Sequence, residues 1–364
     1  MKIQFDHQIF SLQQYGGISR YFSVLQDYIQ DQRNMTMDRG LLVSRNNYLS
    51  ESVYPMPAKL ARTLVSRSRT YSFNKRYSKF LLEKGQFDVF HPTYYDAYFL
   101  PVLKKPFVLT VHDMTHELFP EFFPVHDKFI TYKRKVIERA DHVIAVSTST
   151  RNDLQHIFGI DERKVSVVHH GFYNGNIEAA VDFNPIPNPF ILFVGDRSGY
   201  KNFTRFITGI TPLLHKDKEL FVICAGGGGF NLSERELLHR NRITENIIQL
   251  PVTDSQLKTL YQKTMLFVYP SLYEGFGLPM LEAFSNDCPA AVSRTSCFPE
   301  VGGEAAVYFD PYEPDDILQA IQSVIHNKEY RLLLSQKAEV QLQHFTLDSC
   351  MEKTMDIYRE LGKN

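Results

Sequence analysis

The feature that most constrains the fold is a regular alternation of short apolar runs with helical stretches along all 364 residues. In the first half the pattern predicts strands at 2–6, 40–44, 88–92, 107–112, 142–147 and 165–169. In the second half it predicts strands at 190–194, 220–225, 247–252, 266–269, 290–293 and 306–309. These runs are apolar on both faces, as strands covered by helices in a parallel sheet must be. The chain is therefore predicted to form two doubly wound α/β domains.

A break in the alternation marks the domain boundary. The segment from Gly171 to Pro189 contains three closely spaced prolines with asparagine and glycine, which predicts a linker. We expect one domain over 1–175, a second over 176–345, and a C-terminal helix over 346–364 that packs back on the first domain. Because open α/β sheets bind ligands at the carboxyl ends of their strands, two such domains facing each other predict a cleft for two substrates.

Charge and apolar run lengths exclude several classes of protein. The formal net charge of -1 shows no overall basic character, so no nucleic-acid partner is expected. The longest apolar runs are strand-sized, far below the ~18 residues that a membrane span needs, and the N-terminus does not resemble a signal peptide. The four cysteines have no metal-type spacing and are expected as reduced, packed thiols. A cytoplasmic protein is therefore predicted.

The segment from Glu274 to Glu282 carries the clearest chemical signal, because it follows an apolar strand and opens a helix. Gly275 and Gly277 allow the backbone to approach a ligand closely, and Pro279 suits a first helical turn. The N–H groups of that turn would form an anion site for a phosphate. The two flanking carboxylates suit recognition of hydroxyls on a sugar and on a ribose. The alternative is a strand–turn–helix junction with incidental acidic residues.

A second signal follows the first strand of the second half. Arg197 and Lys201 lie in a turn that begins at Gly195, and such a positive pair can neutralise a leaving diphosphate without a metal. A solvated basic turn is the alternative.

The first half contributes two further loops. His112 and Asp113 end an apolar strand, where the histidine can act as a donor or through its carbonyl. His112 and His116 have the spacing of a helical metal pair, but a loop there removes that geometry, so no metal site is expected. Gly17 and Arg20 follow the first strand; the glycine pair could line a ligand or only form a tight turn, and Arg20 could bind an anion or be exposed.

In order along the chain, these motifs resemble the retaining glycosyltransferases of family 4, which have the GT-B fold of two Rossmann-like domains. The resemblance rests on the two glutamates separated by seven residues within E-G-F-G-L-P-M-L-E. It implies that Glu274 contacts the donor sugar, that Glu282 contacts the ribose, and that the backbone amides of Phe276, Gly277 and Leu278 hold the distal phosphate.

The same resemblance assigns the remaining loops and the two domains. It implies diphosphate contacts for Arg197 and Lys201, although their spacing is one residue tighter than in some members. The first domain would bind the acceptor and the second the donor. The resemblance places His112 at the donor sugar, and Asp113 and Arg20 on the acceptor side. It places Gly17 and Gly195 at the diphosphate. Val252 would lie at the base, with Leu257 or Tyr261 nearby. The run Gly226–Gly229 lacks the dinucleotide fingerprint and is predicted as a flexible turn near the nucleotide.

The resemblance also predicts the reaction. It implies transfer of a hexosyl unit with retention of configuration, with the nucleotide-sugar as a co-substrate and therefore no resident cofactor. The motifs look similar to those of O-antigen and capsule mannosyl- or rhamnosyltransferases, which favours GDP-mannose or a relative over UDP- and dTDP-sugars. A nucleotide-sugar epimerase of the same fold, a noncatalytic scaffold and a dehydrogenase are the weaker alternatives.

One basic stretch bears on the acceptor. The segment 59–84 has eight basic residues against the single acid Glu83, interleaved with leucine and aromatic residues. Such a stretch can dock on an anionic membrane, which fits the lipid-linked glycan acceptors of family members that extend surface polysaccharides. A helix with an ordinary solvated face is the alternative.

Overall fold

The computed structural model describes residues 1–49, 67–124, 128–172, 178–180, 183 and 186–363. The chain divides into two compact domains. The first comprises Met1–His170 together with Asp348–Asn364, and the second comprises Gly171–Leu347. The second domain thus begins at the start of the predicted linker, part of which lies outside the described residues.

Among the residues that the structure describes, every strand pair of the first domain is parallel. The strands are β1 (Lys2–Phe5), β2 (Thr36–Asp38), β3 (Val89–His91), β4 (Val108–Val111), β5 (His142–Ala145) and β6 (Val165–Val167). They form two three-stranded sheets in the orders β2-β1-β3 and β4-β5-β6. A parallel bridge between Phe90 and Phe107 joins β3 to the start of β4. All four residues of β4 are buried, as expected for a strand covered on both faces.

The predicted strand over 40–44 is wrong. Residues 40–44 are not in a strand, and the outer strand is instead β2. The backbone amides of Leu42 and Val43 both donate to Oδ1 of Asn74, at 3.0 and 3.1 Å. The side-chain Nδ2 of Asn74 donates to the Val43 carbonyl. A helix side chain therefore satisfies backbone groups that a strand would pair with a neighbour.

The helices of the first domain pack on the sheets by apolar faces. They are α1 (Gln8–Leu12), α2 (Gly17–Gln30), α4 (Arg67–Lys84), α5 (Thr115–Leu118), α6 (Phe129–Arg139), α7 (Thr148–Phe158) and α15 (Leu347–Leu361). In α2, Phe22, Leu25 and Ile29 recur at helical spacing and are fully buried. Ser147 caps α7, because its side chain accepts a hydrogen bond from the backbone amide of Thr150.

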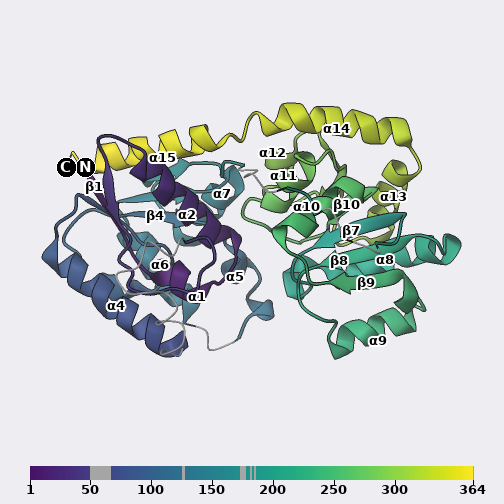
Figure 1. The fold of residues 1–364 in the computed structure, drawn as a ribbon, viewed down its shortest axis with the longest axis horizontal. Coiled ribbons are helices and arrows are strands. Elements are labelled where there is room, and N and C mark those ends of the chain that lie inside the picture. The colour runs from purple at the N-terminus through teal and green to yellow at the C-terminus, as the bar shows by residue number, and fades with distance from the viewer. Residues whose placement is uncertain (50–66, 125–127, 173–177, 181–182, 184–185, 364) are drawn as a thin grey trace. The chain divides into compact units, whose positions relative to one another are not determined.

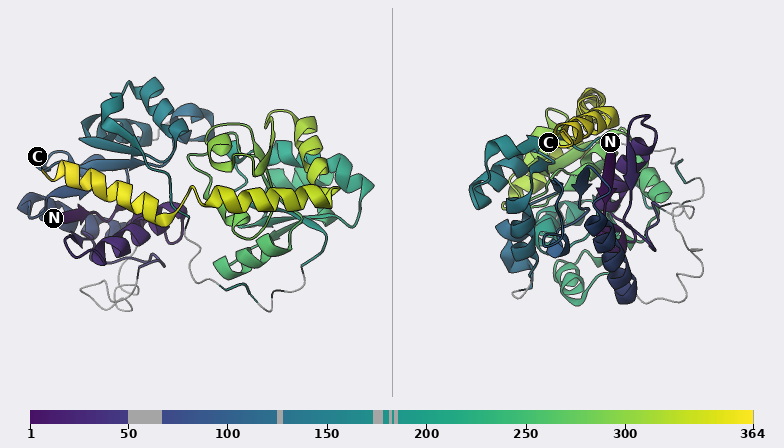
Figure 2. Two further views of the ribbon diagram at one scale, coloured as in Figure 1. Left: turned by 90° about the horizontal axis from the view of Figure 1, so that it is seen from above. Right: turned by 90° about the vertical axis from the view of Figure 1, so that its left-hand side faces the viewer.

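The C-terminal helix α15 belongs to the first domain. Its residues Met351, Met355 and Tyr358 are buried, and the Tyr358 hydroxyl lies 2.6 Å from Nδ1 of His91 on β3. The two chain ends consequently lie side by side (Figures 1 and 2). No helix within the described residues is long and apolar enough to cross a membrane.

In the described part of the second domain, six strands form one parallel sheet. These are β7 (Phe190–Val194), β8 (Phe221–Ala225), β9 (Ile247–Leu250), β10 (Leu266–Tyr269), β11 (Ala290–Ser293) and β12 (Ala306–Phe309). Their order is β12-β11-β10-β7-β8-β9, which is a doubly wound arrangement with its centre at β10 and β7.

Helices cover both faces of this sheet (Figure 1). They are α8 (Phe203–Lys216), α9 (Leu232–Arg240), α10 (Asp254–Lys263), α11 (Leu278–Phe284), α12 (Phe298–Gly302), α13 (Pro314–Ile325) and α14 (Lys328–Leu342). Ile191 and Phe193 of β7 belong to one buried cluster with residues of α8, α9 and α13. On β10, Phe267 contacts Tyr261 of α10, with ring centroids 5.6 Å apart. The predicted class of two Rossmann-like α/β domains is confirmed.

Candidate active site

The carboxyl edge of the second sheet gathers most of the predicted residues. Since all six strands are parallel, the loops that follow β7, β8, β10 and β11 leave the sheet at the same edge. The turn after β7 carries Arg197 and Lys201, and the loop after β10 carries Glu274.

Lys201 and Glu274 form an ion pair at this edge. The Lys201 Nζ donates to Glu274 Oε1 at 2.6 Å, with the two side chains only 18% and 13% exposed. The amide of Leu272 also donates to the Tyr200 carbonyl at 2.7 Å, so backbone and side chains join the two loops. Sequence reasoning gave the two residues separate roles, at the diphosphate and at the sugar. The structure makes them immediate neighbours.

Two residues missed by sequence reasoning support Glu274. Ser296, in the loop after β11, accepts a hydrogen bond from the Glu274 amide at 3.1 Å. Tyr269, the last residue of β10, is 4% exposed, and its pKa is raised by burial and then by the Glu274 carboxylate. The tyrosine therefore stays protonated beside Glu274. The available signal was the position of both residues at the carboxyl ends of parallel strands.

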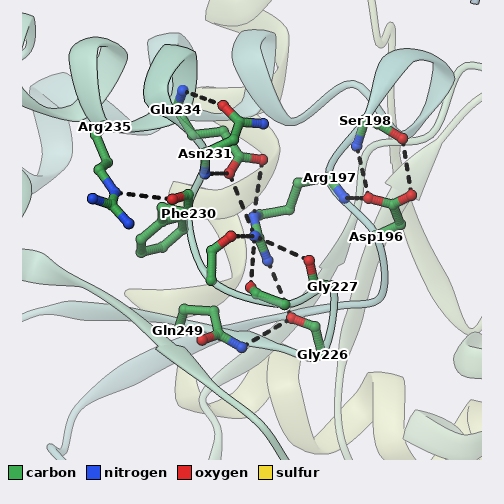
Figure 3. A network of polar contacts seen from close by, with 12 residues as sticks. Asp196, Arg197, Ser198, Gly226, Gly227, Phe230, Asn231, Glu234, Arg235 and Gln249 are labelled. Atoms are coloured by element: carbon green, nitrogen blue, oxygen red, sulfur yellow. Dashed lines mark hydrogen bonds and ion pairs between the residues drawn. The ribbon is translucent and has the colours of Figure 1, made fainter.

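Arg197 has a different environment from Lys201, although the two are only four residues apart. Figure 3 shows the polar contacts around Arg197. Arg197 is 5% exposed. Its Nε donates to Glu234 Oε1 at 3.1 Å, and its two terminal nitrogens donate to the carbonyls of Gly226, Gly227, Gly228 and Gly229. The structure therefore brings Lys201 to Glu274 and turns Arg197 toward the loop after β8.

The predicted ribose and base residues lie on neighbouring elements. Glu282, on α11, accepts a hydrogen bond from the Tyr261 hydroxyl of α10 at 3.3 Å. Burial raises the pKa of Tyr261 well above its usual value, so it remains a donor. Val252 follows β9 and is partly buried, and Gly195 follows β7 and donates its amide to the Ala225 carbonyl at 2.9 Å.

The predicted phosphate amides belong to the start of α11. Gly277 is the N-cap of this helix with φ 85, and a Cβ there would lie 3.3 Å from the Phe298 ring, so only glycine fits without strain. Phe276 is buried and contacts Phe345 edge-on, with ring centroids 5.6 Å apart. Leu278 is the first helical residue. Their contact with a phosphate stays a prediction.

His112 is a buried histidine of the first domain. Its amide donates to the Tyr95 hydroxyl at 3.1 Å, and its Nδ1 lies 3.4 Å from Nε2 of His170. Its Nε2 is buried and has no hydrogen-bond partner among the residues that the structure describes. Burial lowers the pKa of His112 to about 3, so the ring is neutral at pH 7. A buried, unsatisfied ring nitrogen is a group that a ligand hydroxyl can satisfy.

Lys133 of α6 holds the loop that follows His112, and sequence reasoning missed it. Its side chain is 0% exposed, and its Nζ donates to the Asp113 carbonyl at 2.7 Å and to Glu117 Oε2 at 2.9 Å. Burial alone would raise the pKa of Asp113, but Lys133 and the Thr115 amide hold it below its usual value. In the sequence, Lys133 begins a Lys-Arg-Lys run, which gives no sign that one member is buried.

The remaining predicted residues lie at the start of α2. Gly17 is exposed and is the first residue of the helix, and Arg20 is partly buried with its amide donating to the Gly16 carbonyl at 3.0 Å. These positions are compatible with either of the interpretations left open for this loop.

Comparison with known proteins identifies the family of both domains. The glycosyltransferase family 4 model matches residues 37–173, and the model for glycosyl transferases group 1 matches residues 178–341. An O-antigen chain mannosyltransferase, RfbU of Salmonella typhimurium, is 26% identical over 62% of this chain and 62% of its own length. O-antigen chain mannosyltransferase B of Escherichia coli is 25% identical over 72% of this chain and 73% of its own length. The chain thus spans a little less than two thirds of the Salmonella protein.

Solved structures agree in fold over nearly the whole chain. Anabaena HepE in complex with UDP and glucose superposes with a TM-score of 0.75 at 15% identity, covering 98% of this chain and 99% of that one. A sucrose-phosphate synthase from Thermosynechococcus elongatus superposes with a TM-score of 0.74 at 14% identity, covering 99% of both chains. The two family models cover both domains, and the fold agrees with them. The chain therefore belongs to the family 4 glycosyltransferases and has their GT-B fold.

Proposed function

We propose that the protein transfers mannose, or a closely related hexose, from a GDP-sugar to a glycan acceptor with retention of configuration. The observation that carries the proposal is the Lys201–Glu274 ion pair at the carboxyl edge of the second sheet. It places a cation for a phosphate beside a carboxylate for sugar hydroxyls. The O-antigen mannosyltransferases among the relatives support mannose and surface polysaccharide synthesis.

In the proposed reaction, the bond between the anomeric carbon and the diphosphate oxygen breaks while the acceptor oxygen bonds to the same face of that carbon. The acceptor proton passes to the departing phosphate oxygen, so the step requires no dedicated base. Lys201 stabilises the charge that develops on the diphosphate, because a cation already held at the site needs little reorganisation. Glu274 orients the sugar and stabilises positive charge at the anomeric carbon.

Other residues complete the proposed donor site. Glu282 accepts from the ribose hydroxyls, the base lies near Val252, and Gly195 allows the diphosphate to approach the turn after β7. The backbone amides of Phe276, Gly277 and Leu278 hold the distal phosphate. Arg197 does not share the role of Lys201, because its N–H groups are engaged by protein acceptors.

The first domain contributes His112 in this proposal. Its ring is neutral at pH 7, because burial lowers its pKa to about 3, and its Nε2 can serve a sugar hydroxyl without adding charge. Asp113 and Arg20 contact the acceptor, and Gly17 leaves room for the diphosphate.

A binding and turnover experiment tests the proposal. Thermal shift with GDP-, UDP-, dTDP- and ADP-sugars should give the largest stabilisation with GDP-mannose. With a lipid-linked glycan acceptor, the protein should release GDP in proportion to the acceptor added, and NMR of the product should show the anomeric configuration of the donor. An epimerase would convert the sugar without releasing more nucleotide when acceptor is present. The absence of any shift would overturn the proposed function.

We further propose that α4 docks on an anionic membrane, where a lipid-linked acceptor would be found. One face of α4 is held by the domain through Asn74 and Ser78, which bond to the backbone of 40–43. The opposite face is exposed, and there Phe73 and Phe80 are 52% and 48% exposed. Exposed basic residues flank these rings: Arg69, Arg76, Lys79 and Lys84. Lys59 and Arg62 of the predicted basic stretch lie outside the described residues.

Vesicle sedimentation tests this docking surface. Binding to vesicles with phosphatidylglycerol should exceed binding to neutral vesicles and should fall with salt, since each cation near the surface contributes ~1 kcal/mol. Replacing both phenylalanines by serine should weaken binding without loss of transfer to a water-soluble acceptor. Equal binding to neutral and anionic vesicles would contradict the proposal.

A further inference from the structure

The loop Gly226–Gly229 converges on the guanidinium group of Arg197 (Figure 3). One terminal nitrogen donates to the Gly226 carbonyl at 3.1 Å. The other lies within hydrogen-bond distance of the carbonyls of Gly228, Gly227 and Gly229, at 2.8, 3.3 and 3.3 Å. One side chain therefore accounts for the carbonyl oxygens of four consecutive residues.

The conformation of this loop requires both the glycines and the cation. Gly226, Gly227 and Gly228 have φ of 86, 68 and 70, a left-handed run that side chains rarely allow. A Cβ on Gly227 would lie 2.6 Å from the Gly195 carbonyl oxygen and 2.7 Å from a terminal nitrogen of Arg197. Because four carbonyl dipoles point toward one place, a positive charge there stabilises an arrangement that would otherwise be repulsive.

Glu234 fixes Arg197 from the other side. Its Oε1 accepts from Arg197 Nε at 3.1 Å, and its Oε2 accepts from a terminal nitrogen at 3.4 Å. Glu234 is itself held at the start of α9 by a capping box with Asn231. The Arg197 side chain is only 2% exposed. A direct contact with a diphosphate would therefore require Arg197 to leave both the loop and Glu234.

The loop lies where the nucleotide end of the donor is proposed to bind. The Gly226 amide donates to the Leu250 carbonyl at the end of β9, and the Gly195 amide donates to the Ala225 carbonyl at the end of β8. The Gln249 amide also donates to the Gly226 carbonyl at 3.2 Å. The loop is thus tied to the turn after β7 on one side and to the strand that precedes Val252 on the other.

We propose that Arg197 is a positioning residue. It holds the Gly226–Gly229 loop against the nucleotide, and Lys201 is the cation that touches the diphosphate. This inference rests on the proposed function for the identity of the ligand. It departs from the expectation that both cations contact the diphosphate.

Nucleotides that differ by one phosphate separate the two roles. The probes are GDP and GMP, or UDP and UMP if the wild-type protein binds UDP more tightly. Replacing Arg197 by lysine keeps a charge but removes the planar set of donors. Arg197→Lys should weaken the binding of GDP and of GMP by the same factor, on the order of tenfold. Lys201→Met should weaken the binding of GDP much more than that of GMP. The proposal is overturned if Arg197→Lys weakens the binding of GDP but not of GMP, or if it changes neither affinity.

Hydrogen exchange on the unliganded protein tests the loop itself. In Arg197→Lys, peptides over 221–234 should lose protection. The Gly226 amide donates to the Leu250 carbonyl, and we expect this hydrogen bond to open more often when Arg197 no longer holds the loop. Glu234→Gln should show a smaller effect of the same pattern, and it serves if Arg197→Lys folds poorly. Arg240→Lys, on the exposed end of α9, is the matched control and should change nothing.

The two measurements distinguish this inference from the proposed function. If the wild-type protein binds no nucleotide, the proposed function fails, while hydrogen exchange still decides whether Arg197 holds the loop. Unchanged exchange over 221–234 in Arg197→Lys refutes the positioning role even if nucleotide binding is normal.

Discussion

Replacing Glu274 by glutamine should separate donor binding from sugar transfer. Glu274 now neutralises Lys201 through a contact of 2.6 Å. Glutamine keeps the size and a hydrogen-bonding oxygen but removes the negative charge. The variant should therefore bind GDP more tightly than the wild type, because Lys201 is no longer neutralised and a carboxylate no longer repels the diphosphate. It should transfer sugar far more slowly, because the carboxylate beside the sugar is lost.

The structure sets the size of both effects. Two unit charges 2.6 Å apart attract by about 6 kcal/mol at an effective dielectric constant near 20. Desolvation of these largely buried groups offsets most of that energy, which leaves a net coupling of about 1.5–3 kcal/mol, the range of a charge-assisted hydrogen bond. Loss of the repulsion between the Glu274 carboxylate and the diphosphate should raise the affinity for GDP by about threefold to tenfold. Loss of a group that acts on the transition state should lower kcat by about 10²–10³.

Three variants measured side by side make the assay. GDP affinity is measured by calorimetry, and kcat by release of GDP in the presence of acceptor, for Glu274→Gln, Lys201→Met and the double variant. Lys201→Met should lower the affinity for GDP by about tenfold to a hundredfold. In the double variant the gain in GDP affinity from Glu274→Gln should disappear, because the lysine that Glu274 neutralises is no longer present. Urea unfolding of the four proteins gives the coupling energy in the absence of ligand.

Two outcomes would refute this reasoning. One is a Glu274→Gln variant that binds GDP more weakly than the wild type, as Lys201→Met does. The other is additivity of the two substitutions in GDP binding to within about 0.5 kcal/mol, the behaviour of independent sites.

Three further predictions concern the buried Lys133, three buried histidines and the proposed ribose contact of Glu282. Lys133→Met should destabilise the protein by about 3–5 kcal/mol in urea unfolding, because Glu117 is left as a buried, unpaired carboxylate; adding Glu117→Gln should restore much of the loss. Burial lowers the pKa values of His7 to about 4 and of His91 and His112 to about 3, so the stability that they confer is present above their unfolded pKa of 6.5 and is lost as pH falls toward those values. The urea midpoint should drop between pH 7 and 4.5 by an amount equivalent to about 2 kcal/mol per histidine, and a midpoint independent of pH would be the contrary result. Glu282→Ala should weaken GDP by about tenfold and 2′-deoxy-GDP by much less, measured by calorimetry; an equal loss for both would exclude a contact with the 2′-hydroxyl.

The fold could be predicted well from the sequence, because the signals that specify it are local. A strand covered on both faces is a short apolar run, and a helix that covers it has apolar residues at helical spacing. Strand β7 has the predicted bounds, as do β10, β11 and β12. The predicted strand over 40–44 failed because its apolar pattern is equally compatible with a segment held by a side chain. The amide of Asn74, more than 30 residues away, decides between the two.

The candidate site could be predicted as a set of residues but not as a set of contacts. The glycines, glutamates and basic residues are visible as motifs at strand ends. Their pairing is not visible, since the Lys201–Glu274 contact joins residues 73 positions apart. Ser296 and Tyr269, which support Glu274, carry no motif of their own.

Burial of charge is the property that only the tertiary structure decided. The sequence by itself determined two α/β domains with parallel strands, and a motif typical of sugar-nucleotide binding at the strand ends of the second domain. It placed Arg197 and Lys201 in one turn and predicted the same role for both, at the diphosphate. In the structure, the Arg197 side chain donates to four glycine carbonyls and to Glu234. Lys201 lies at the carboxyl edge of the second sheet, beside Glu274. The physical reason is that a charge is buried only where distant parts of the chain supply its partners, and no local pattern records which parts those are.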